Sequence, residues 1–428
     1  MPLPTLLETT QPQDGGQAQV GSEPILQVSL YSATGVDSTY TNTLTEIYRG
    51  LVSRVNFGYD RIGGADSCDV EIEGGIDALD DAVVNEYEIR IERGTAAAPS
   101  TLTVWYRGRV VGYRHSTTPD GRVMTVIEAE GYSTRLADIR VSGVTWPAGT
   151  TIKTVVGDIY TSYLQPQTRI QYEATAIQGA YALIGGLTFD CDARTALRTL
   201  ALLQGSTEWG VSESGQLYFH TEGSSQSNTG VVVVSGQTPD ASEDGSFRRA
   251  FNRIVAFGGK TAGTAATATA NDAGAQAQYG MRSTTIYEPA LFSATDLQRL
   301  ADNVLAITAV GEGSAYGEVE SPGARLETPR TTVDATLPAE KKFRFVGLGG
   351  VQFDGHYSRV SYHYRKSSPT RFFARVWTGP AQQTIVRELQ RLRDDVAGLI
   401  YSQVATADGV GAHNLLSASH SDTTAASV

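Results

Sequence analysis

The chain has 428 residues, of which 40% are hydrophobic and 19% are charged, and its formal net charge is −12. This composition indicates a globular protein of about two to four domains and excludes a disordered chain. The negative charge argues against a surface that grips nucleic acid, although DNA could slide past an acidic wall without binding.

Secretion and membrane signals are not evident. Cys68 and Cys191 are the only cysteines, too few for a disulfide framework. The N-terminus lacks the basic and apolar regions of a signal peptide. No run approaches the ~20 apolar residues that a membrane helix needs.

Residues 1–24 are rich in Gln, Pro, Gly and Thr and predict an extended arm. Residues 25–140 then predict a first β-barrel domain, because apolar and polar residues alternate in several runs. In one such run Cys68, Val70 and Ile72 alternate with acidic residues. Asp120-Gly121 lies between two runs and predicts a hairpin turn.

Residues 141–235 predict a small α+β domain. Helical spacing links Ile152 to Tyr163, and a second helix is expected after Asp190, with Gly205 as its end. A hairpin from Trp209 to Phe219 follows.

Residues 236–380 predict a second β-barrel domain with two interruptions. The Ala/Thr/Gly tract 260–280 shows no core-forming pattern and is expected to be a long loop. Residues 293–308 predict a helix, with Ser293 and Asp296 as a capping pair.

Residues 381–404 predict a coiled-coil helix that leads to a C-terminal segment, 405–428. The apolar positions are spaced 4, 3, 4, 3, and a g-position Glu and the next e-position Arg would meet across parallel helices. The alternative is one amphipathic helix packed on its own domain. The expected oligomerisation residues are Ile385, Glu388, Leu389, Leu392, Arg393, Val396 and Leu399.

No catalytic signature is found, and we expect neither a catalytic residue, nor a cofactor, nor a metal. Four acidic residues could hold a cation or act as a glycosidase pair, but a solvated loop is favoured; they are Asp77, Asp80, Asp81 and Glu86. If three copies of the chain associate, His413 and His420 of each copy would meet on the threefold axis. Ordinary polar packing is favoured there over a metal site. The basic patch Arg248, Arg249 and Arg253 is interpreted as an intersubunit contact.

Several segments, in this order, resemble the baseplate hub or tail-associated proteins of tailed bacteriophages. The first is a strand with a glycine between two arginines, and the next is a short helix that leads to a Trp strand and a hairpin. A strand that begins with Asn follows, and then a terminal His-Ser-Asp-Thr segment. These segments are Tyr106–Val111 with Glu130–Leu136, Thr195–Phe219, Phe251–Val255 and Ala412–Thr423.

The resemblance implies a mainly β fold with an α+β insert, namely two tail-tube-like barrels, a small α+β module and a C-terminal coiled-coil helix. It implies a homotrimeric virion protein at the tail tip, assembled in the host cytoplasm, that caps the tail tube and opens for DNA ejection. The implied partners are the tail tube protein, the distal tail protein, the tape measure protein and a fibre or spike. The alternatives are a tail-borne glycan hydrolase and a host receptor-binding protein.

Overall fold

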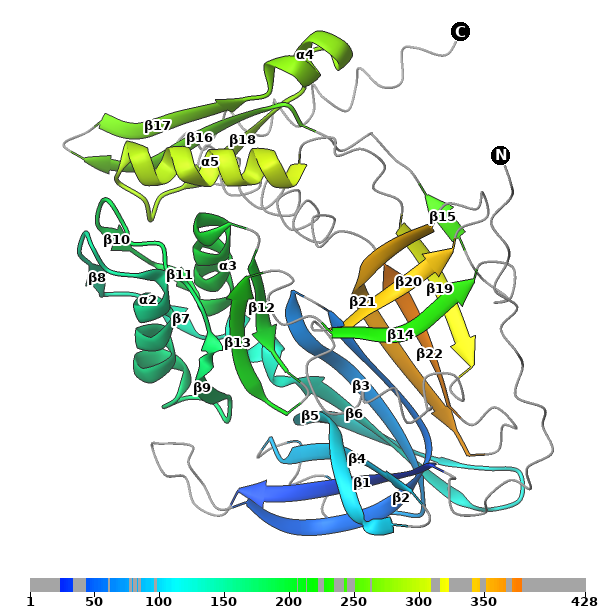
Figure 1. The fold of residues 1–428 in the computed structure, drawn as a ribbon. Helices are drawn as coiled ribbons and strands as arrows, with labels where there is room; N and C mark the ends of the chain where they lie inside the picture. The colour runs from blue at the N-terminus through cyan, green and yellow to red at the C-terminus, as the bar shows by residue number, and fades with distance from the viewer. Residues whose placement is uncertain are drawn as a thin grey trace, which may run out of the picture.

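The computed structural model describes the greater part of the chain between residues 24 and 378 (Figure 1). The predicted arm before residue 24, the heptad helix 381–404 and the segment 405–428 lie outside the described residues. The described ranges are 24–33, 44–60, 62–76, 79, 83, 86–95, 98–205, 207–212, 214–221, 227–234, 242–244, 251–261, 264–308, 316–322, 341–346, 352–366 and 372–378.

Six antiparallel strands close into a barrel, in the cyclic order β1-β2-β3-β6-β5-β4 and back to β1. The prediction of a β-barrel within residues 25–140 is therefore confirmed. Along β3, Cys68, Val70 and Ile72 are buried while Asp69 and Glu73 are exposed, because successive side chains point to opposite faces. The strands are β1 (Pro24–Ala33), β2 (Leu44–Asp60), β3 (Gly63–Glu73), β4 (Glu88–Thr95), β5 (Ala98–Thr117) and β6 (Val123–Gly131).

A helical region follows the barrel. The helix α3 begins at its N-cap Asp192, whose side chain accepts a hydrogen bond from the Thr195 amide, and it ends at Gly205, whose φ is 112°. Asp192 therefore caps the helix that the sequence predicted after Asp190. The elements are η1 (Tyr132–Ala137), β7 (Arg140–Val141), β8 (Thr145–Trp146), α2 (Ile152–Ile159), η2 (Tyr160–Leu164), β9 (Gln171–Ile177), β10 (Leu187–Thr188), β11 (Cys191–Asp192), α3 (Ala193–Gln204), β12 (Thr207–Val211) and β13 (Gln216–Thr221).

A three-stranded sheet with the order β17-β16-β18 carries the long helix α5 on one face. The prediction of a long loop at 260–280 is wrong, since this tract contains β17 and α4. The small Ala268 and Ala270 are buried beneath α5, while Thr267 and Thr269 face outward. The elements are β16 (Arg253–Thr261), β17 (Thr264–Asn271), α4 (Ala273–Tyr279), β18 (Ser283–Glu288) and α5 (Ala294–Thr308).

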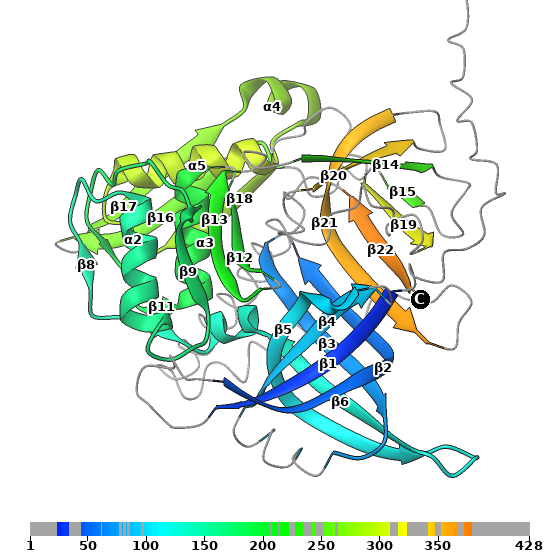
Figure 2. The same cartoon turned by 60° about the horizontal axis from the view of Figure 1, so that its bottom comes forward.

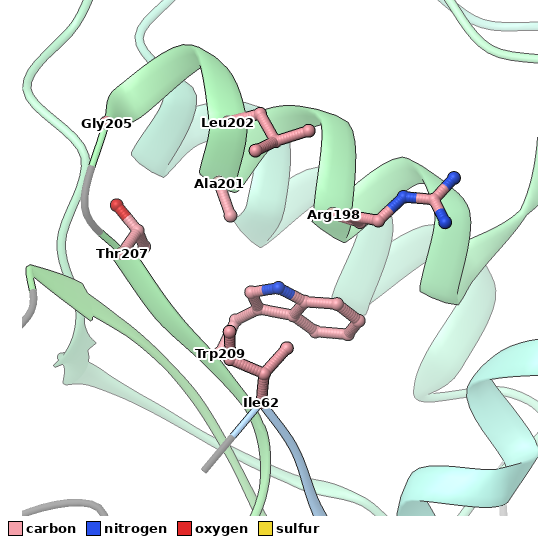
Figure 3. A pocket seen from close by; sticks show the side chains of 7 residues that line it. All are labelled: Ile62, Arg198, Ala201, Leu202, Gly205, Thr207 and Trp209. Carbon is pink, nitrogen blue, oxygen red and sulfur yellow. The ribbon is translucent and has the colours of Figure 1, made fainter. Parts of the chain in front are cut away.

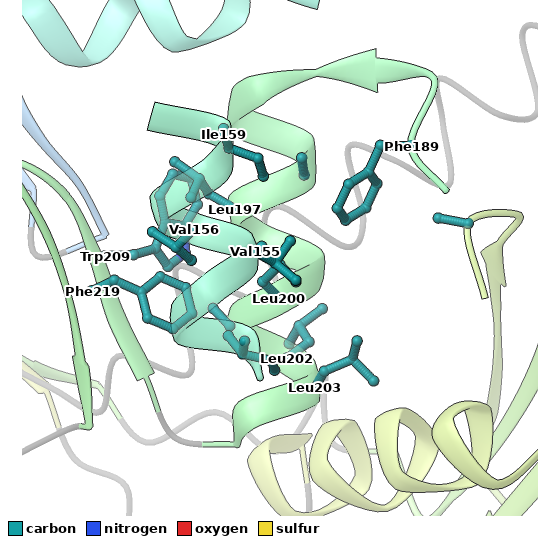
Figure 4. Packing of buried hydrophobic residues seen from close by; sticks show 14 of the residues in the cluster. Val155, Val156, Ile159, Phe189, Leu197, Leu200, Leu202, Leu203, Trp209 and Phe219 are labelled. Atoms are coloured by element: carbon teal, nitrogen blue, oxygen red, sulfur yellow. The ribbon is translucent and has the colours of Figure 1, made fainter. Parts of the chain in front are cut away.

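One hydrophobic core joins this sheet and α5 to α2, α3 and β12 (Figures 1 and 4). In Figure 4, Leu197 and Leu200 of α3 meet Val155 of α2, while Trp209 and Phe219 close the core from the hairpin β12–β13. The core therefore crosses the boundary that the sequence placed at 235/236. A separate core fills the first barrel.

Six further strands lie beside the barrel in the order β14-β20-β21-β22-β19-β15 (Figures 1 and 2). The long strand β21 also pairs with β2, from Arg54 opposite Arg365 to Asp60 opposite Arg359. A closed second barrel stays a prediction. The strands are β14 (Ser227–Val234), β15 (Ser242–Asp244), β19 (Tyr316–Pro322), β20 (Lys341–Val346), β21 (Gln352–Arg365) and β22 (Phe372–Thr378). Among the described residues, no helix is long and apolar enough to cross a membrane.

Candidate functional site: the junctions between structural units

The barrel meets the helical region through two backbone segments that lie unusually close together. Gly63 and Gly64 of β3 pair in parallel with Gly210 and Val211 of β12. Gly64 has a φ of 98°, and a β-carbon there would collide with the Val211 backbone. Only glycine can adopt this conformation and leave room for the neighbouring chain, so this contact is built into the sequence.

A buried ion pair lies at the same junction. The Glu88 carboxylate accepts hydrogen bonds from Arg107 at 2.8 Å, Arg90 at 2.6 Å and the Tyr132 hydroxyl at 2.8 Å. Burial alone would raise the pKa of Glu88, but Arg107 above all, together with Arg90 and Tyr132, outweighs this effect, so the pKa is lowered. Arg107 also donates to the Ser214 carbonyl in the β12–β13 turn. The pair thus fixes the hairpin to the barrel.

Glu86 forms a second charged centre beside it. Its carboxylate lies 2.7 Å from both Arg109 and Arg135, and its carbonyl accepts from Arg169 at 3.2 Å. Its φ is 48°, a left-handed conformation that is uncommon for residues other than glycine. Because two arginines already neutralise this carboxylate, it fits poorly as a cation ligand. The other acidic candidates, Asp77, Asp80 and Asp81, lie outside the described residues.

The helix α5 is held against the helical region by its polar side chains. The Ser293 hydroxyl accepts a hydrogen bond from the Asp296 amide at 3.4 Å. The Asp296 carboxylate does not complete the predicted capping pair; instead it accepts from the Tyr181 hydroxyl and the amides of Ile184 and Gly185 at 2.6–3.0 Å. Asp296 is completely buried. This carboxylate therefore ties α5 to a loop more than a hundred residues earlier.

Two further α5 side chains satisfy the C-terminal carbonyl groups of α3. Arg299 donates to the Leu203 carbonyl at 2.8 Å, and Asn303 donates to the Leu202 carbonyl at the same distance. The last carbonyls of a helix have no partner within the helix, so α5 completes α3 as well as covering it.

Asn252 belongs to the segment Phe251–Val255 that resembles the hub proteins. It binds the residues on both sides of α4. Its side chain donates to the Gly280 carbonyl and accepts from the Arg282 amide, both at 2.7 Å. Its carbonyl accepts from the Asp272 amide and from the Gln276 side chain. The sequence marked this residue only by resemblance, and the structure supplies its physical role.

Most of the remaining sequence candidates lie outside the described residues. Arg253 lies 3.5 Å from the Met281 sulfur, while Arg248, Arg249, His413 and His420 lie outside the described residues, as do all the heptad residues. Asp190 pairs with Arg140 at 2.8 Å. No group of three or more metal-binding side chains is found among the described residues.

A Ser–His–Asn array lies on the β2–β21 seam. The His363 ring is 3.1 Å from the Ser361 hydroxyl and 2.8 Å from the Asn56 side chain. These are the distances of a nucleophile, a base and an orienting group. However, β21 is paired on both sides by β2 and β22, so its amides are committed to the sheet and offer no oxyanion donors. We interpret the array as a cross-strand polar contact.

Figure 3 shows a hollow between α3 and β12, beside Trp209 and Arg198. Its volume of about 10 Å³ has room for about one water molecule. A sugar or peptide substrate would not fit there.

No family model matches the chain, and no curated protein matches it by sequence. Solved structures do match it. The 43 kDa tail protein of prophage MuSo2 from Shewanella oneidensis is similar with a TM-score of 0.55 and 12% identity, over 83% of this chain and 99% of that chain. The tail protein from Neisseria meningitidis MC58 is similar with a TM-score of 0.56 and 10% identity, over 83% and 96%. The chain has the fold of phage tail proteins.

Proposed function

We propose that this chain is a structural hub protein at the tail tip, or baseplate, of a tailed bacteriophage. The observation that carries the proposal is the fold: two tail proteins match over nearly their whole length. The order of the sequence motifs between Tyr106 and Thr423 points to the same role.

In this proposal three copies form a ring that caps the tail tube. The heptad residues, Ile385 to Leu399, hold the threefold axis and direct the chain toward a fibre or spike. The tail tube protein, the distal tail protein and the tape measure protein are the partners on the other side. Phage DNA passes through the lumen without specific binding, because the chain is acidic.

The proposed role is mechanical and not enzymatic. The two similar proteins are described as tail proteins. Opening of the ring would be driven by rearrangement of packed interfaces. Such a rearrangement would act on the junctions described above. These are the charged centres at Glu86 and Glu88 and the contacts of α5 with the helical region.

The test is the solution mass of the purified chain by light scattering, beside a variant that carries Leu389→Asp and Leu392→Asp. A mass of three times 45.7 kDa that falls to 45.7 kDa in the variant supports a coiled-coil-held trimer. A trimer that survives the variant means that the β units hold the ring. A monomer in both samples contradicts the trimeric hub.

A further inference from the structure

Among the described elements, α5 covers one face of the sheet β17-β16-β18, and the opposite face, called here the open face, carries exposed side chains. Ile254 and Ala256 of β16 point into the core beneath α5 and are buried. Their neighbours Val255 and Phe257 point to the opposite face, because side chains alternate along a strand. Figure 1 shows α5 on one side of this sheet.

Large apolar side chains gather on the open face. The rings of Phe257 and Tyr287 stack across neighbouring strands, with centroids 5.5 Å apart and an interplanar angle of 17°. The Phe292 ring lies over Gly259, since a β-carbon on that glycine would come within 2.5 Å of the ring. Tyr287 is 53% exposed, Phe292 39% and Met281 63%. We call Met281, Val255, Phe257, Tyr287 and Phe292 the aromatic face.

The surroundings of the aromatic face are basic in an acidic chain. The described residues 251–287 contain three Arg and Lys residues and one Asp, a net charge of +2, so the rest of the chain carries −14. The one acidic residue, Asp272, is engaged as the N-cap of α4. Arg253 lies against Met281, and Arg282 and Lys260 are exposed.

We propose that the aromatic face is a subunit contact that binds an acidic surface on a second copy of this chain. Contiguous exposed apolar surface marks interaction sites, and the opposite charges of residues 251–287 and the rest of the chain supply the complementarity. Buried aromatic side chains carry most of the binding energy in such contacts.

The contact joins two different surfaces of the chain, and such heterologous contacts form a ring when the rotation between subunits closes. The inference rests on the proposed function, because it names a surface through which the proposed ring is built. It places that surface in the β units, independently of the heptad residues.

The test uses a thiol in place of Tyr287 in the full chain, with Cys191→Ser to remove the half-buried native thiol; Cys68 is buried. The matched control is Leu51→Cys, since Leu51 is 55% exposed and Tyr287 53%. Maleimide labelling of each variant is compared in the oligomer and in chain diluted to monomer. We expect Tyr287→Cys to label markedly more slowly in the oligomer, while Leu51→Cys labels equally in both states.

A second variant measures the energy of the contact. Tyr287→Asp is expected to weaken association about 30-fold, as loss of an interface aromatic does, with an unchanged far-ultraviolet circular dichroism spectrum. Leu51→Asp should leave association unchanged.

Equal labelling of Tyr287→Cys in oligomer and monomer, with the oligomer intact, overturns this inference and leaves the proposed hub standing. Protection that requires added duplex DNA also overturns it and makes the face a polyanion contact. A chain that is monomeric at every concentration overturns the inference and the proposed function together.

Discussion

Glu88 places a carboxylate inside the junction between barrel and hairpin, where it is completely buried. Removing a charge from water costs several kcal/mol, and this cost is recovered only if partners surround the charge. Arg107, Arg90 and Tyr132 all donate to it. The junction therefore depends on having all its members, and loss of one is worse than loss of the pair.

Arg107→Met should destabilise the fold by about 3–5 kcal/mol, because it leaves the Glu88 carboxylate buried without its main partner. Chemical denaturation at pH 7 measures this. Arg122→Met is the control, since Arg122 pairs with Asp120 and Glu73 on the exposed surface, and little change is expected there. A similar small effect for both variants would contradict the importance of the buried pair.

The same residue predicts a pH dependence. The pKa of Glu88 lies below its ordinary value of 4.5 in the folded chain, so its contribution is present above that value and lost as the pH falls through the folded pKa. In Arg107→Met the burial effect is less opposed. The wild-type advantage over this variant should therefore shrink as the pH falls from the higher folded pKa of Glu88 in the variant to its lower folded pKa in the wild type.

Glu288 shows the opposite sign. Burial raises its pKa, while a 2.7 Å hydrogen bond from Thr199 of α3 only partly opposes this effect. The raised pKa means that its contribution is present at low pH and is lost as the pH rises through the folded pKa. Glu288→Gln should therefore stabilise the chain at pH 7 and make no difference at pH 4. Thermal unfolding at the two pH values measures this, and destabilisation at pH 7 would count against it.

At the scale of the elements, α5 connects parts of the chain that are far apart in sequence. Asp296→Ala should cost about 2–4 kcal/mol, because the Tyr181 hydroxyl and two amides lose their acceptor. Hydrogen exchange should rise in residues 181–185. Asp302→Ala, on the exposed side of α5, is the control and should leave this loop unchanged.

The sequence predicted those elements in which apolar and polar side chains follow a regular pattern or in which the ends carry clear capping residues. The strand β3 shows buried apolar and exposed acidic residues in turn, and α3 has both a capping Asp and a terminal Gly. It failed at β17, where alanine forms the buried face. Alanine is a poor marker of a core position, yet Ala268 and Ala270 are what lets α5 approach closely.

The junctions could be predicted only in part. The motif around Arg107 and Gly108 was recognised by resemblance, but its partner Glu88 is 19 residues away and its other contact, Ser214, is 107 residues away. Local patterns hold no information on such pairings. Likewise, the role of Gly259 in seating Phe292 depends on a tertiary contact.

At the scale of the molecule, the two hydrophobic cores predict two patterns of response. Leu297 of α5 is fully buried in the core shared with α3 and β16. Leu297→Ala should cost about 2–5 kcal/mol and increase hydrogen exchange in α3 and β16 together. The barrel strands β4 and β5 should keep their protection. A response confined to α5 would show that the shared core does not act as a unit.

The pairing of β21 with β2 has a mechanical consequence. β2 pairs with β1 along its first half, then with β3 on one side and β21 on the other. The barrel therefore continues without a break into the second strand set, and β22, at the end of the described chain, is the next strand. A pull at Thr378 would pass through β22 and β21 into β2 as shear along hydrogen-bonded ladders. Many hydrogen bonds would share that load at once, so the pairing would resist a pulling force better than bonds that break one at a time.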